Sequence, residues 1–167
     1  MPSGMQKSLL MLCSALLCSC TGPRASLQKM IIPIEQLPPG LSMPLIKPAS
    51  IPHMRFVNYN PQIFTKRESV NTVAFVLMTP YFDRENLTGA LVSSYRAPEI
   101  VEVYGLTFIN ASNCEAARKT LKPRFQAREG IKILTRENRM GIIWSKEGQK
   151  PADATFDVLV DYIDAQL

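Results

Sequence analysis

Hydrophobic and polar positions follow three clear patterns in the second half of the chain. Residues 70–79 are rich in β-branched and aromatic side chains and stop at Pro80, which is typical of a buried strand. Residues 99–109 carry apolar side chains in both alternating sets, which predicts an interior strand. Residues 152–165 place apolar side chains at helical spacing with aspartates opposite, which predicts an amphipathic terminal helix.

Weaker signals fill the gaps between these elements. They predict, in order, a strand at 55–59, a helix at 82–95, a helix at 112–121, and a hairpin of strands at 131–135 and 141–145. Ser112 and Glu115 have the spacing of a capping box at the start of the second helix, which Pro123 should end. The order β-α-β-α-β-β-α predicts one small α+β domain at 55–167. Its sheet is mixed or antiparallel, with the helices packed on one face.

Prolines are frequent within residues 23–62, including those at positions 33, 38, 39, 44, 48, 52 and 61. Proline at this density opposes a helix or a central strand, so residues 20–54 are predicted to form an extended tether. Apolar residues such as Ile31 and Leu41 lie between the prolines. They favour a second interpretation, in which the segment docks as a strip on a partner or on the protein's own domain.

The start of the chain has the features of an export signal. Lys7 precedes an apolar run at 9–17, which is far shorter than the roughly 20 residues of a membrane-spanning helix, and the run ends in Leu17-Cys18-Ser19-Cys20. This segment resembles the signal of bacterial lipoproteins, which ends in a leucine, two small residues and an invariant cysteine. Cys18 departs from that pattern, because the family usually has Ala, Ser or Thr there.

The resemblance implies that residues 1–19 are a signal peptide and that Cys20 is acylated, which anchors the protein in a membrane. Thr21 in place of an aspartate implies the periplasmic face of the outer membrane. Two alternatives stay open: an ordinary cleaved signal that leaves a soluble periplasmic protein, and a buried apolar N-terminal helix.

The chain beyond residue 19 is mildly basic, with 18 basic and 14 acidic side chains and a formal net charge of +4. Basic residues gather at 118–139, where the acidic residues are Glu129 and Glu137 alone. The candidate binding residues are Arg118, Lys119, Lys122, Arg124 and Arg128. They suit an anionic lipid, a cell-wall surface or an acidic protein, and a solvated face without a ligand is an equal alternative. Nucleic acid is not expected, because only Phe125 interleaves with these charges.

No catalytic constellation can be assembled from this sequence. His53 is the only histidine, and Cys114 is the only cysteine after residue 20, so a catalytic triad, a zinc site and an internal disulfide all lack partners. Cys114 shares a helical face with Ala117 and Leu121, which predicts a buried and inert thiol. No glycine-rich phosphate motif is present, and no cofactor is expected.

These features predict a non-catalytic interaction or assembly module of a cell-envelope complex, such as a secretion or conjugation apparatus. The order β-α-β-β-α at 99–167 resembles that of the small ring-building modules of bacterial secretion machines, at the level of fold alone. Two other functions stay open: a stand-alone periplasmic binding or inhibitor lipoprotein, and an enzyme with an unrecognised site.

Overall fold

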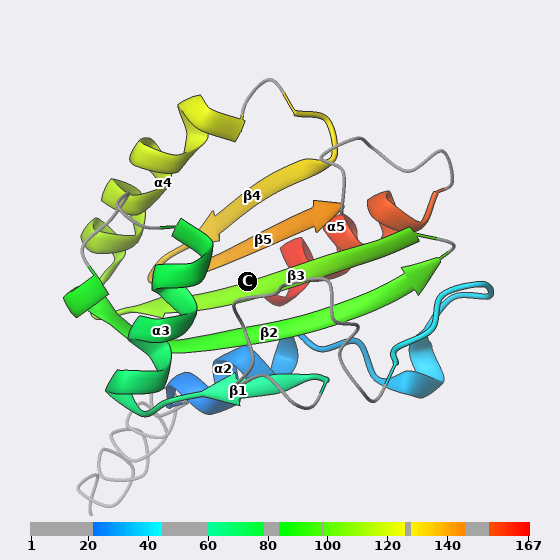
Figure 1. Cartoon of the computed structure of the whole chain (residues 1–167), viewed down its shortest axis with the longest axis horizontal. Coiled ribbons are helices and arrows are strands. Elements are labelled where there is room, and N and C mark those ends of the chain that lie inside the picture. Colours follow the sequence, from blue (N-terminus) through cyan, green and yellow to red (C-terminus); the bar gives the residue numbers. More distant parts are fainter. Residues whose placement is uncertain (1–21, 45–59, 79–83, 98, 126–127, 146–153) are drawn as a thin grey trace, which may run out of the picture.

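The computed structural model describes residues 22–44, 60–78, 84–97, 99–125, 128–145 and 154–167. One five-stranded antiparallel sheet runs in the order β1-β2-β3-β5-β4 (Figure 1). The strands are β1 (Gln62–Phe64), β2 (Leu87–Ala97), β3 (Glu99–Phe108), β4 (Ile131–Arg136) and β5 (Arg139–Ser145). The α-helices are α2 (Pro23–Lys29), α3 (Arg67–Met78), α4 (Ala111–Phe125) and α5 (Thr155–Gln166). The predicted α+β class is confirmed.

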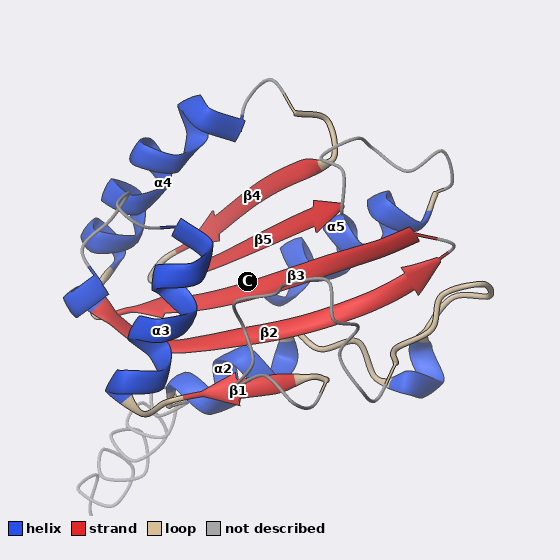
Figure 2. Cartoon of the chain, viewed as in Figure 1, coloured by secondary structure: helices blue, strands red, loops and turns tan. Residues whose placement is uncertain are grey.

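Helices cover both faces of the sheet (Figure 2). Helices α3 and α4 cover one face, whose core includes Leu106 and Met140, and we call it the α3/α4 face. Helices α2 and α5 cover the other, the α2/α5 face, whose core includes Leu91 and Ile143. The prediction that the helices pack on one face is therefore wrong. The central strands are apolar in both alternating sets, so both faces must be covered to remove them from water.

Two segments have the opposite type of secondary structure from the one predicted. Residues 67–78 form helix α3 rather than a strand, and Val70 and Val73 are buried one turn apart against the sheet. Residues 87–97 form strand β2 rather than part of a helix, and β2 pairs with β3 from Leu87 to Ala97. Both segments are apolar enough for either type, so the tertiary partner decides. The predicted strand at 55–59 lies outside the described residues.

Helix α4 begins and ends differently from the prediction. The side chain of Asn110 accepts a hydrogen bond from the N–H of Asn113 (2.9 Å), so Asn110 caps the helix and the Ser112 capping box does not form. Pro123 lies inside α4 without ending it. Proline removes the hydrogen bond to the carbonyl of Lys119, and both residues are exposed, so water can satisfy that carbonyl. The hairpin of β4 and β5 and the terminal helix α5 are confirmed.

The described part of the predicted tether, residues 22–44, is packed on the α2/α5 face. Pro23 occupies the first turn of α2, where its missing N–H has no intrahelical partner to lose. Leu27 and Met30 are completely buried. An extended tether is therefore wrong for these residues, because the apolar side chains between the prolines complete the core of the domain.

Two tyrosines hold this segment by its backbone. The Tyr95 hydroxyl accepts a hydrogen bond from the N–H of Ile32 (3.1 Å). The Tyr162 hydroxyl of α5 lies 3.2 and 3.1 Å from the carbonyl oxygens of Lys29 and Ile31. The backbone at the end of α2 and just after it thus forms hydrogen bonds with side chains of the sheet and of α5.

Two glycines let helices lie directly on the sheet. Gly105 of β3 and Gly141 of β5 are paired across the two strands on the α2/α5 face. A Cβ atom at Gly105 would lie 2.6 Å from Met30 Sδ, and one at Gly141 would lie 2.5 Å from Ile163 Cγ2. The close approach of both helices therefore depends on the absence of a side chain at these positions.

Candidate binding groove

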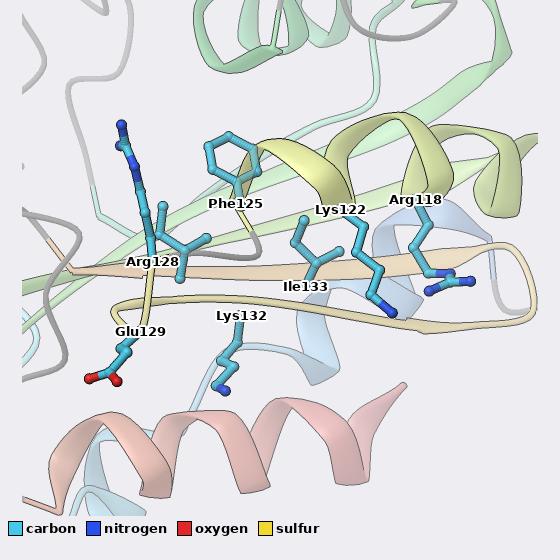
Figure 3. Close-up of a pocket in the computed structure, with 8 residues that line it drawn as sticks. Arg118, Lys122, Phe125, Arg128, Glu129, Lys132 and Ile133 are labelled. Atoms are coloured by element: carbon cyan, nitrogen blue, oxygen red, sulfur yellow. The ribbon is translucent and has the colours of Figure 1, made fainter.

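A groove of about 330 Å³ lies between α4 and the edge strand β4 (Figure 3). Helix α4, strand β4 and the segment that joins them supply its lining, which consists of Arg118, Lys122, Phe125, Arg128, Glu129, Ile131, Lys132 and Ile133. We call it the α4–β4 groove. It is open at the side of β4 that has no neighbouring strand, so a ligand can reach both helix and strand.

Apolar side chains form the floor of the groove. Ile131 is buried, and Ile133 and Phe125 are half-buried against the core of the α3/α4 face. The Phe125 ring packs edge-on against Trp144, with 5.4 Å between the ring centroids. This contact fixes the ring and leaves part of it available to a ligand.

The positive charges around the groove are not equally available. Arg118 Nε and Nη2 each lie 2.6 Å from an oxygen of the Glu115 carboxylate. Hydrogen bonding within this pair lowers the pKa of Glu115 and raises the pKa of Arg118. Among the described residues, neither Lys122 nor Arg128 has an ion pair. Lys132 of β4 also lines the groove without an ion pair among those residues, so Lys122, Arg128 and Lys132 carry the positive charge available to a ligand.

Figure 3 shows how the charged side chains are directed. Lys122 extends from α4 to a position beside β4. Arg128 lies at the other end of the groove and points away from β4. Lys132 and Glu129 point towards the α5 side of β4. Lys132 does so because alternate residues of a strand point to opposite faces, and its neighbours Ile131 and Ile133 face α4.

The structure brings together three of the five predicted binding residues, namely Arg118, Lys122 and Arg128. Lys119 is exposed on α4 but does not line the groove, and the side chain of Arg124 lies outside the described ones. Sequence reasoning missed Ile131 and Ile133, although the alternation of apolar and basic residues along 131–136 was a signal of a half-buried edge strand. Cys20, the predicted acylation site, and His53 lie outside the described residues.

Ionisable groups are also buried elsewhere in the core. The Cys114 thiol lies 3.3 Å from the carbonyl oxygen of Arg139, and burial raises its pKa to about 11. Its predicted burial is confirmed. The Tyr104 hydroxyl donates to the buried Glu102 carboxylate on the same strand, and burial followed by the nearby carboxylate raises the Tyr104 pKa well above its usual value. A single acid inside an apolar strand was the signal that sequence reasoning did not use.

Within the ranges that the structure describes, no group of His, Cys, Asp and Glu side chains could hold a metal ion. No helix in those same ranges is both long enough and apolar enough to cross a membrane. Comparison of the chain with protein-family models, curated proteins and solved structures found no match. The α4–β4 groove is therefore the feature from which a function can be argued.

Proposed function

We propose that the protein is a lipid-anchored, non-catalytic interaction module of an outer-membrane complex, such as a secretion or conjugation apparatus. In this proposal the α4–β4 groove binds an acidic surface of a partner protein in the periplasm. One observation carries it: the groove combines an apolar floor with the cations Lys122 and Arg128, which have no ion pair among the described residues. Apolar contacts supply affinity at a protein interface, and the charged rim steers the encounter and selects the partner.

The spread of the charges favours a protein over a small anion. A phosphate or a lipid head group binds best where several donors converge on one point. In this groove Lys122 and Arg128 diverge (Figure 3), and the Arg118 guanidinium is bound to Glu115. A ligand long enough to meet the two cations separately fits this arrangement better.

The proposed anchor at Cys20 would hold the domain close to the membrane. One residue, Thr21, lies between Cys20 and Gly22, where the described chain begins, and an extended chain covers at most about 3.5 Å for each of these two steps. The acylated cysteine would therefore lie within about 7 Å of the packed domain. Helix α2 contacts β1, β2 and β3, and the groove lies along β4 at the opposite edge of the sheet (Figure 1), so the groove would be on the side of the domain away from the anchor.

The test is a pull-down of the tagged full-length protein from detergent-solubilised envelopes, in wild-type and variant forms. The double variant Lys122→Glu/Arg128→Glu reverses two charges of the groove that have no ion pair in the described part of the chain. Its matched control, Lys66→Glu/Lys119→Glu, makes the same change in net charge at exposed positions outside the groove. We expect the groove variant to lose its envelope partners and the control to retain them.

Retention of every partner by the groove variant would contradict the proposal. Equal loss of partners in both variants would also contradict it, because the loss would then depend on net charge and not on the groove. The intact mass of wild type beside Cys20→Ala tests the anchor separately, because acyl chains raise the mass of the wild type alone. A monomer without envelope partners that carries a bound small molecule would favour a stand-alone binding protein.

A further inference from the structure

Strand β4 is an edge of the sheet, because β5 alone pairs with it within the ranges that the structure describes. Its outer side therefore presents backbone groups that another strand can bind. The other edge is the three-residue strand β1, which is too short to offer a comparable surface. The groove thus lies along the longer of the two sheet edges.

The pairing between β4 and β5 shows which residues face outward. The N–H of Ser145 donates to the carbonyl of Gly130 (2.9 Å), and the register continues from there along both strands. Backbone groups of an antiparallel strand point to its partner at every second residue only. Residues 132, 134 and 136 therefore bond to β5, and residues 131, 133 and 135 direct their backbone groups outward.

Some of these outward groups are free to bind a ligand. The N–H of Ile131 already donates to the carbonyl of Arg128 (3.1 Å). For the N–H groups of Ile133 and Thr135, no hydrogen-bond partner is found in the part of the chain that the structure describes. The N–H and carbonyl groups of Ile133 and Thr135 thus form a short row of backbone groups at the mouth of the α4–β4 groove, to which another strand could bind.

We propose that the groove binds an extended, acidic segment of a partner protein, which adds to the sheet as a further strand on β4. The inference rests on the proposed function and specifies how the partner binds. Backbone hydrogen bonds to Ile133 and Thr135 would supply the register, and every second side chain of the segment would enter the groove. Apolar side chains there would contact Phe125 and Ile133, while acidic ones would meet Lys122 and Arg128.

Charge selects a partner over a second copy of this chain. Pairing of β4 with β4 of another copy would bring Lys132 and Arg136 of both copies to one seam. Like charges opposite each other destabilise a strand pair, and basic residues on an edge are a common protection against self-association. Lys132 and Arg136 would instead attract an acidic segment and stabilise its pairing with β4.

The first experiment measures amide hydrogen exchange in the full-length protein in detergent, residue by residue. The probe is a capped decapeptide whose odd positions alternate valine and glutamate and whose even positions are threonine, so that one face carries both side chains, and its control is a capped decaglutamate. Strand addition predicts that the alternating peptide slows exchange at Ile133 and Thr135 by about tenfold or more. The amides of Lys132 and Leu134 should not change, because β5 already protects them.

Binding of either peptide without slower exchange at Ile133 and Thr135 would overturn strand addition and leave the groove as a charged binding surface. Absence of binding by both peptides would overturn the inference as well. The envelope pull-down decides the proposed function independently of either outcome.

The second experiment compares Thr135→Pro with Thr135→Ala in the partner pull-down. Proline removes the outward N–H at a position where an edge strand tolerates it, whereas alanine keeps the N–H. We expect Thr135→Ala to capture partners as the wild type does and Thr135→Pro to capture about tenfold less. Equal capture by two folded variants, checked by thermal unfolding, would overturn the inference.

Discussion

Residues of equal formal charge have different environments in this fold. Arg118 and Lys122 are one turn apart on α4, but Arg118 is bound to Glu115 and Lys122 has no ion pair among the described residues. Glu115 is four residues before Lys119 and three before Arg118, so the sequence allowed either partner. The contact in the structure makes Lys122 and Arg128, rather than the whole basic cluster, the residues to test.

At the residue scale, we expect the Cys114 thiol to resist iodoacetamide at pH 7 in the native protein and to react once the chain unfolds. Its side chain is fully buried, and its pKa of about 11 keeps it protonated, whereas the thiolate is the reactive form. Mass spectrometry before and after denaturation measures the difference. Rapid labelling of the native protein would contradict the burial.

The same thiol makes stability depend on pH. Its folded pKa lies above the ordinary value of 9.0, so its contribution is complete below pH 9 and is lost as the pH rises towards 11. The loss amounts to about 2 kcal/mol. Unfolding in urea at pH 8 and 10.5 measures the loss. Cys114→Ala lacks the thiol, so its fall in stability between the two pH values gives the contribution of all other titrating groups. An equal fall in both proteins would contradict the assignment.

At the scale of elements, the pairing of β2 with β3 outweighs the local pattern of β2. Helical spacing at 82–95 indicated a helix, yet β2 gains hydrogen bonds with β3 along its whole length. Helix α3 is the converse case, because its β-branched residues favour a strand, yet Val70 and Val73 pack on the sheet from a helix. Neither outcome follows from propensity within the segment, since the decisive partner is remote in sequence.

The contact of helices with glycine gives a prediction at the same scale. Gly141→Ala should lower the free energy of unfolding by about 1–3 kcal/mol, because the new Cβ would lie 2.5 Å from Ile163 and push α5 off the sheet. Gly22→Ala is the control, since no atom lies within 4 Å of a Cβ there. It should lower stability by less than about 1 kcal/mol in the same urea titration, and any such loss reflects the place of Gly22 as the N-cap of α2. Equal stability of both variants would show that α5 does not depend on this close approach.

At the scale of the whole molecule, the segment after the proposed anchor is part of the folded domain. We therefore expect the peptide bond after Lys29 to resist trypsin under native conditions, because Tyr162 binds the carbonyl of Lys29 and the next residue, Met30, is buried. Mass spectrometry of a limited digest measures the cleavage. Tyr162→Phe should accelerate it, and rapid cleavage of the wild type would indicate a tether instead.

Local pattern was enough to predict the α+β class, the interior strand β3, the hairpin of β4 and β5, the terminal helix and the buried Cys114. Each of these depends on periodicity within one segment, which sequence displays directly. The basic cluster was likewise visible, because net charge over 118–139 is a property of composition.

Only the tertiary structure decided the rest. It set the type of α3 and β2, covered both faces of the sheet, packed residues 22–44 as core and left β4 as the open edge. It also joined Lys122 and Arg128 to the apolar floor of one groove. The physical reason is common to all of these features: burial and pairing depend on which distant surfaces meet, and a segment's own sequence does not name its partner.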